Sequence, residues 1–174
     1  MTRRASRAVE TEASPEMLYL WICQLRRAPY SYDCLDHFGR RSPRPADPAM
    51  RALEVGQPVM TIFSLSDFTV NRSLTISMAS GWPSLVFGAI TVRYAIVPSA
   101  SGRTVLRADL LMPPLDGPLA GLRRYLLAWG DLFMMRKQLR TLAALAEEDT
   151  ADASNASRGI SGARLVPTVR RLQR

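Results

Sequence analysis

The sequence predicts an α+β fold in which a curved antiparallel sheet is wrapped around a long C-terminal helix. Residues 59–112 place apolar side chains at alternate positions, as strands with one buried face do. Residues 118–148 instead repeat their apolar side chains with the period of an amphipathic helix. A sheet with a single apolar face needs a cover, and one long helix can supply it. A strongly curved sheet around such a helix tends to leave a space between them.

The N-terminal part predicts a strand followed by a helix. Residues 5–12 alternate loosely, as expected of a first strand. Ser14 is a favourable N-cap, Pro15 suits the first helical position, and apolar residues then recur at helical spacing. These apolar residues are Leu18, Trp21, Ile22 and Leu25. Pro29 predicts the end of this helix.

The segment between this helix and the strands has a mixed composition. A short helix is expected at about 33–38, closed by Gly39, and a proline-rich linker at 42–58. The strands that follow present one apolar face, formed by Leu74, Ile76, Met78, Ile90, Val92, Tyr94, Ile96, Leu106, Ala108, Leu110 and Met112. Pairing across the turn at 98–102 is expected to put Arg93 near Arg107 and diagonal to Asp109.

Composition limits the class of protein. The chain has 174 residues, of which 47% are apolar, enough for one domain with a buried core. No apolar run is long enough to span a bilayer, and the basic N-terminus lacks the apolar stretch of a signal peptide. We therefore expect a cytoplasmic protein. Two cysteines and one histidine, without metal-ligand spacing, predict neither a metal site nor a cofactor.

The net charge of +8 lies mainly at the two ends of the chain. Residues 1–9 carry +3, residues 150–174 carry +4, and residues 10–149 carry only +1. A protein that reads nucleic acid carries its basic face on the folded domain, so no specific nucleic-acid partner is expected. The composition predicts a disordered N-terminus at 1–4, a folded domain at 5–148 and a basic disordered tail at 149–174. We expect the basic tails to contact anionic surfaces only weakly.

An unusual group of side chains follows the first predicted helix. Its members are Tyr30, Tyr32, Asp33, Asp36, His37 and Arg40. Aromatic side chains this close together indicate a segment that either folds back onto the core or lines a cavity. Asp33 and His37 are four residues apart and would meet on a short helix, as an oriented general base or as a local helix support. The second interpretation is favoured, because no serine or cysteine nucleophile accompanies the pair.

The long helix carries a charge on its predicted apolar face. This face is formed by Tyr125, Trp129, Leu132, Leu139 and Ala143, with Leu122, Leu126 and Phe133 beside it. Arg136 is predicted to project from the same face. It would then pair with an acid such as Asp33 or Asp36, reach the surface along its apolar stem, or anchor the acidic or carbonyl end of a bound molecule. The structural interpretations are favoured over the ligand anchor.

The chain resembles a known superfamily in its element order and in three local sequences. These are Gln24-Leu25-Arg26, the run from Ala28 to Asp33, and Gly39-Arg40-Arg41-Ser42-Pro43. Together they resemble bacterial members of the SRPBCC superfamily, which includes START, pollen-allergen and polyketide-cyclase-like proteins. The resemblance covers about residues 5–148. It implies the helix-grip fold, with an apolar cavity between the curved sheet and the long helix, and it implies no single chemistry.

These observations favour the binding of a hydrophobic small molecule, of lipid, polyketide or isoprenoid type, in an internal cavity. The candidate ligand-binding residues are Tyr30, Tyr32, Asp33, Asp36, His37, Arg40, Tyr94, Trp129, Phe133 and Arg136. An enzyme of the polyketide cyclase or aromatase type, with several of the same residues orienting and polarising a carbonyl, is the alternative. An interaction module that touches anionic partners through its basic ends is a third. The sequence leaves open whether any reaction is catalysed.

Overall fold

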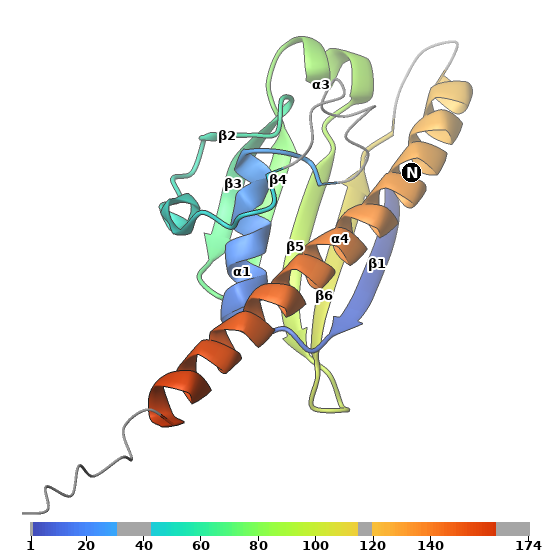
Figure 1. The fold of residues 1–174 in the computed structure, drawn as a ribbon. Coiled ribbons are helices and arrows are strands. Elements are labelled where there is room, and N and C mark those ends of the chain that lie inside the picture. Colours follow the sequence, from blue (N-terminus) through green and yellow to red (C-terminus); the bar gives the residue numbers. More distant parts are fainter. Residues whose placement is uncertain (1, 31–42, 115–119, 163–174) are drawn as a thin grey trace, which may run out of the picture.

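The structure is a computed structural model that describes residues 2–30, 43–114 and 120–162 (Figure 1). Within these ranges, side chains are described except those of Arg3, Val86 and Phe87 and of residues 120–133 and 158–162. The predicted short helix at 33–38 therefore lies outside the described residues.

One six-stranded antiparallel sheet, in the order β1-β6-β5-β4-β3-β2, forms the framework. The strands are β1 (Arg3–Thr11), β2 (Pro58–Val59), β3 (Phe63–Thr69), β4 (Ser73–Met78), β5 (Thr91–Pro98) and β6 (Thr104–Met112). β1 and β2 form the two edges, and from β2 the chain runs back across the sheet strand by strand until β6 pairs with β1. The predicted α+β class with an antiparallel sheet is confirmed.

Two helices pack on the same face of the sheet, which we call the inner face (Figure 1). They are α1 (Pro15–Cys23), continued by the 3₁₀ turn η1 (Gln24–Arg26), and α4 (Ala120–Gly162). A second 3₁₀ turn, η2 (Pro48–Arg51), lies inside the segment predicted as a linker. The short helix α3 (Trp82–Phe87) connects β4 to β5 and projects at one end of the sheet (Figure 1).

The predicted start of α1 is confirmed in detail. The Ser14 hydroxyl accepts a hydrogen bond from the backbone N–H of Met17 at 3.2 Å, and Pro15 occupies the first turn. Regular helix ends at Cys23, and the chain then passes through η1 before Pro29.

Two helices differ from their predictions. α4 ends at Gly162 rather than at about 148, and its last part extends beyond the sheet (Figure 1). This part is rich in alanine, the strongest helix former, and the Ser154 hydroxyl donates to the carbonyl of Thr150 within the helix. α3 was not predicted, because its six residues between Gly81 and Gly88 are mostly apolar and short enough to suit a strand.

The register between β5 and β6 differs from the expected one by two residues. Arg93 lies directly opposite Asp109, whereas Arg107 lies opposite Ala95. The expected Arg93–Arg107 pairing was therefore wrong. The observed register puts opposite charges face to face, and it also joins Arg107 to Asp109 on its own strand at 2.9 Å.

The alternation of the strands is confirmed by burial on the inner face. The predicted inward side chains are all buried except Met78, which is half-buried. Side chains of α1 and α4 complete the core, among them Leu18, Trp21, Ile22, Leu25, Leu139, Leu142, Leu145 and Ala146. The part of the inner face that α1 and residues 139–146 of α4 cover is thus filled by apolar side chains.

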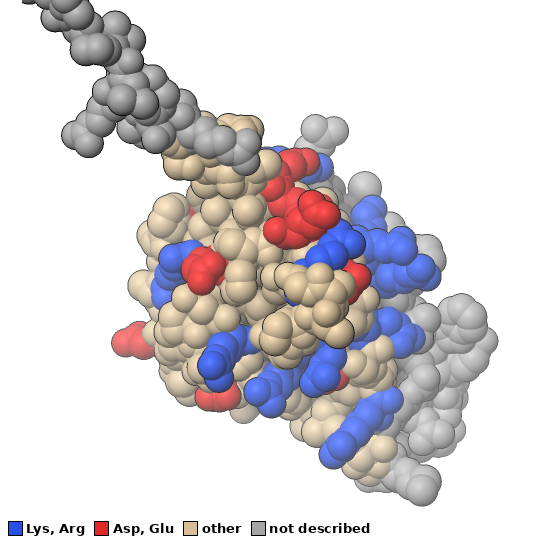
Figure 2. Space-filling model, turned by 90° about the horizontal axis from the view of Figure 1, so that it is seen from below, with Lys and Arg blue, Asp and Glu red and all other residues tan. Residues whose placement is uncertain are grey.

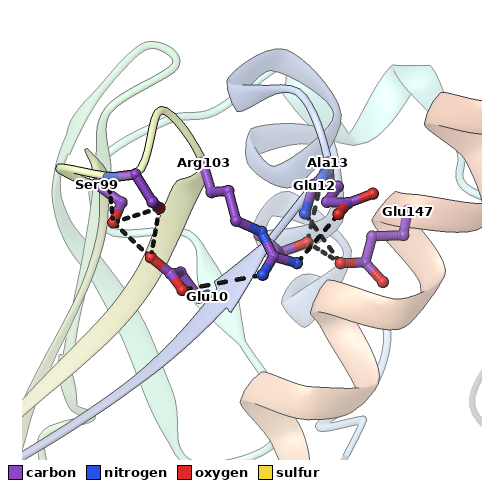
Figure 3. Close-up of polar contacts among 8 residues, drawn as sticks. Glu10, Glu12, Ala13, Ser99, Arg103 and Glu147 are labelled. Atoms are coloured by element: carbon purple, nitrogen blue, oxygen red, sulfur yellow. Dashed lines mark hydrogen bonds and ion pairs between the residues drawn. The ribbon is translucent and has the colours of Figure 1, made fainter.

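α4 is fastened to the junction between β1 and α1 by hydrogen bonds around residues 147–150. The Glu147 carboxylate accepts from the Thr11 hydroxyl at 2.7 Å and from the Glu12 N–H at 3.0 Å (Figure 3). The Trp21 indole N–H donates to the Asp149 carboxylate at 2.9 Å. Because Trp21 is fully buried, this bond satisfies its one polar atom and joins the two helices.

The same end of β1 is joined to the β5–β6 turn. The Arg103 guanidinium lies between Glu10 and Glu12, 3.9 Å and 3.4 Å from their carboxylates (Figure 3). Ser99 and Ser101 donate hydrogen bonds to Glu10, which hold the pKa of its carboxyl below the usual value. One end of β1 therefore connects the sheet, the turn and α4.

Replacement of Glu147 tests this attachment. Hydrogen bonds from the Thr11 hydroxyl and from the Glu12 N–H lower the pKa of Glu147 from 4.5. Its contribution to stability is therefore complete above pH 4.5 and is lost as the pH falls through the lower folded-state value. We expect Glu147→Gln to reduce the free energy of unfolding at pH 7 by about 0.5–1 kcal/mol. In urea unfolding, the difference between variant and wild type should be smaller at pH 3 than at pH 7.

Glu54→Gln, at an exposed loop position, serves as the control and should leave stability unchanged. A Glu147→Gln deficit of the same size at both pH values would show that the carboxylate charge is not what fastens α4.

Candidate functional site

The inner face stays apolar at the end of the sheet nearest α3. Here β4 ends, β5 begins and β6 ends, so their inward side chains come together. Ile90, Val92, Leu110 and Met112 are buried at this end, and Met78 is half-buried. α4 runs along the inner face mainly over β1 and β6, so its N-terminal half lies to one side of this end (Figure 1). The sheet thus provides an apolar wall at this end, continuous with the rest of the core.

A buried polar pair lies at the middle of the inner face. The Tyr94 hydroxyl on β5 donates to the Gln138 side-chain carbonyl on α4 at 2.7 Å. The Gln138 amide donates in turn to the backbone carbonyl of Pro29, in the segment after η1. Tyr94 is 2% exposed and Gln138 is 6% exposed, so neither side chain competes with bulk water for these bonds. Three separate segments are therefore held together by one neutral polar chain.

Tyr30 is the last described residue of the segment after η1. Its ring is 2% exposed and meets the ring of Trp21 edge to face, with centroids 5.7 Å apart. Its hydroxyl donates to the Pro43 carbonyl at 2.9 Å, across the segment 31–42 that follows it. Tyr30 has a φ of +53°, a left-handed conformation that is rare outside glycine. The tyrosine thus folds back onto the core, which is one of the two interpretations of this segment.

The remaining predicted site residues are distributed as follows. Tyr32, Asp33, Asp36, His37 and Arg40 lie outside the described residues. Trp129 and Phe133 belong to α4, but their side chains also lie outside the described set. Of the candidates with described side chains, Tyr30 and Tyr94 are buried, and Arg136 is exposed.

The prediction that Arg136 projects from the apolar face of α4 was wrong. The buried stripe of the described part of α4 centres on Leu139, Leu142 and Ala146, and Arg136 lies beside it in solvent. Its side chain is exposed, as in the alternative in which it reaches the surface, whereas Asp33 and Asp36, its suggested partners, lie outside the described residues. The error arose because Tyr125 and Trp129 were used to centre the face.

Arg136 instead lines a surface groove of about 530 Å³ on the outer side of α4. Among the described residues, its lining consists of Arg44, Arg136, Lys137, Arg140, Thr141, Ala144, Leu145 and Glu148. We call it the basic groove. Figure 2, from another side, likewise shows Lys and Arg side chains gathered along the surface of the folded part. The near-neutral total for residues 10–149 thus conceals local basic surfaces, which the sum over each segment could not reveal.

The described residues of the inner face carry little acid–base chemistry. Among all the described residues, the buried polar side chains other than tyrosine are Thr11, Gln24, Ser73 and Gln138, none of which ionises. Cys23 is fully buried, and burial raises the pKa of its thiol to about 12, so it stays protonated at neutral pH. Within the described ranges, no cluster of three metal-ligating side chains occurs and no helix is long and apolar enough to cross a membrane.

Gln138 is the member of the buried polar pair that sequence reasoning missed. It lies on the same stripe as Met135, Leu139 and Leu142, so a single polar residue on an apolar face was its signal. The apolar face predicted from the sequence was rotated relative to the observed one. The prediction therefore left Gln138 off the apolar face and put Arg136 on it. Arg44 was missed as well, since nothing local links it to α4.

Comparisons with known proteins place the fold. No family model matches the chain, and no curated protein matches its sequence. The Zhui aromatase/cyclase from Streptomyces sp. R1128 is similar in structure, with a TM-score of 0.54 and 12% identity over 84% of this chain and 94% of that one. The MLL2253 protein from Mesorhizobium loti has a TM-score of 0.50 and 13% identity over 84% and 98% of the two chains.

The di-domain aromatase/cyclase StfQ, from the steffimycin biosynthetic pathway, has a TM-score of 0.50 and 12% identity. The match covers 87% of this chain and 52% of StfQ, about the share that one of two domains would occupy. At these identities the similarity shows a common fold. The chain thus has the helix-grip fold that its sequence resemblance implied.

A double-mutant cycle tests the buried polar pair. Tyr94→Phe leaves the Gln138 side-chain carbonyl without this donor, and should cost about 1–3 kcal/mol of unfolding free energy. Gln138→Met leaves the Tyr94 hydroxyl without its acceptor on α4, at a similar cost. The double variant should cost less than the sum by at least about 0.5 kcal/mol, measured by urea unfolding. Additivity within about 0.3 kcal/mol would show that the two side chains act independently.

Proposed function

We propose that the protein binds a hydrophobic small molecule between the N-terminal half of α4 and the inner face of the sheet. The supporting observation is the apolar wall formed by Ile90, Val92, Leu110 and Met112 at the α3 end of the inner face. Concave, mostly apolar surfaces with a few polar groups are the usual ligand sites of proteins. Tyr94 and Gln138 are the polar groups closest to this wall in the sheet register and along α4.

The chemical class of the ligand follows from these surroundings. An apolar wall with a neutral hydroxyl and amide at its edge favours a largely hydrocarbon molecule with one or a few carbonyl or hydroxyl groups. A lipid, a polyketide and an isoprenoid all fit this description. Two of the solved structures with this fold are described as aromatase/cyclases, which agrees with the polyketide type. Tyr30, Tyr32, Asp33, Asp36, His37, Arg40, Tyr94, Trp129 and Phe133 are the proposed ligand contacts.

Binding is favoured over catalysis by the chemistry of the described inner face. Hydroxyl and amide N–H groups such as those of Tyr94 and Gln138 can donate to a carbonyl group, but no described Asp, Glu, His, Lys or Arg side chain is buried there. A general acid or base would have to come from the region that includes Asp33 and His37. A cyclase or aromatase reaction therefore depends on those two residues, whereas binding does not.

Two phenylalanine substitutions on one strand test whether a ligand space exists. Leu110 and Leu106 lie on β6, four residues apart and on the same face, and both are buried. Leu110 belongs to the proposed wall, and Leu106 to the part filled by α1 and α4. We expect Leu110→Phe to change the free energy of unfolding by less than about 0.5 kcal/mol, because the larger ring enters free space. Leu106→Phe should cost about 1–3 kcal/mol, as overpacking of a filled core does.

The same variants should differ in ligand binding. Nile red is a suitable probe because it is neutral and does not respond to the positive charge of the surface. Its fluorescence should rise on titration into wild-type protein. The apparent affinity for Nile red should be at least about fivefold lower in Leu110→Phe. A destabilised Leu110→Phe together with no Nile red binding to wild type would contradict the proposed function.

A further inference from the structure

The basic groove contains more positive charge than its surroundings neutralise. Arg136, Lys137 and Arg140 line it from α4, and Arg44 lines it from the segment before η2. Glu148 is the one carboxylate among the described lining residues. Arg136 and Arg140 are four residues apart, so their side chains are neighbours on the helix surface and repel each other. The chain thus brings together cations that are 92 residues or more apart, counted from Arg44 to Arg136.

Three of these cations have no ionic partner among the described residues. The ion pairs among the described residues join Arg103 to Glu10 and Glu12, and Arg107 to Asp109. Arg44, Arg136 and Arg140 belong to none of them, although Glu148 lines the same groove. Lys137 makes an interaction of its own and still adds its charge to the groove. An anion entering the groove would relieve this repulsion without breaking an existing ion pair.

We propose that the basic groove binds a small molecule that carries a phosphate or diphosphate group. A guanidinium group matches a phosphate through two parallel hydrogen bonds, and three arginines can hold more than one phosphoryl group. The volume of about 530 Å³ lies in the range of small-molecule sites.

The other lining residues suggest the rest of the molecule. Ala144 and Leu145 add an apolar patch, and Thr141 adds a hydroxyl. Glu148, three residues farther along α4 than Leu145, can accept a hydrogen bond from a hydroxyl or amino group. The expected ligand is therefore an organic phosphate with an apolar part and a hydrogen-bond donor, rather than a simple inorganic ion.

This site is separate from the proposed hydrophobic one. The residues of the basic groove lie mainly on the outward side of α4, and Arg136, Lys137 and Arg140 are exposed. The apolar wall lies on the inner face of the sheet. A variant that empties the groove of charge should therefore leave Nile red binding unchanged, so the two proposals can fail independently.

Isothermal titration of the full chain with inorganic pyrophosphate, at constant ionic strength, tests the proposal. Arg136→Gln/Arg140→Gln should weaken pyrophosphate binding at least about tenfold. Arg72→Gln/Arg93→Gln removes the same charge from exposed positions elsewhere and should change the affinity less than about twofold. Glu148→Gln should strengthen binding about two- to threefold, because it removes a negative charge from the groove.

A second variant separates a loss of binding from a loss of folding. Arg44→Gln changes an exposed residue outside α4 and should weaken binding about threefold or more, with an unchanged circular dichroism spectrum and melting temperature.

Two results would overturn the proposal. One is an equal loss of affinity in both double variants, which would show that pyrophosphate responds only to the overall charge of +8. The other is no pyrophosphate binding, combined with groove-dependent binding to phosphatidylcholine vesicles containing phosphatidylglycerol. That second result would make the groove a membrane-contact surface instead.

Discussion

The arrangement of this molecule depends on where α4 is attached. α4 has 43 residues and is about 65 Å long, whereas the longest strands have nine residues and reach about 30 Å. Such a helix must extend beyond the sheet, and its attachment decides which part does so. Hydrogen bonds from Thr11, Glu12, Ser14 and Trp21 hold it at residues 147–150. Before this point α4 runs over the inner face, mainly over β1 and β6, and the residues after it project away (Figure 1).

The same attachment divides the inner face into two parts with different properties. Near residues 139–146, side chains of α1 and α4 fill the space against the sheet. Farther toward α3, the strands still present apolar side chains, and the N-terminal half of α4 lies to one side of them. Tyr94 and Gln138 stand between these parts, where their hydrogen bond holds helix and strand at a constant distance. The ligand space that we propose lies at the α3 end of the inner face, next to this filled core.

Much of the fold could be predicted because strands and helices leave different periods in the sequence. The inward residues of β4, β5 and β6 and the N-cap Ser14 were all predicted correctly. The pairing partner of Arg93 was predicted wrongly. A turn of several residues permits more than one register, and the apolar alternation is the same in registers two residues apart. α3 was missed because six apolar residues carry no period of their own. The end of α4 was missed because small polar residues suit either a helix or a tail.

The candidate site was less predictable, since it depends on which residues meet across the chain. Tyr94 was placed on the inner face, but its partner Gln138 could be found only once the rotation of α4 was known. The charges of the basic groove cancel in a count along the chain and gather only after folding, when Arg44 comes beside α4. The helix-grip fold was implied by a resemblance in element order and three local sequences, and the solved structures of the same fold confirm it.

A crystal structure under xenon pressure tests the central claim most directly. Xenon enters apolar cavities that are empty of side chains and of water. The account predicts xenon density beside Val92 and Leu110, between the sheet and the N-terminal half of α4, and none beside Leu106. Continuous side-chain packing from Leu106 to Met112, without xenon density, would contradict it.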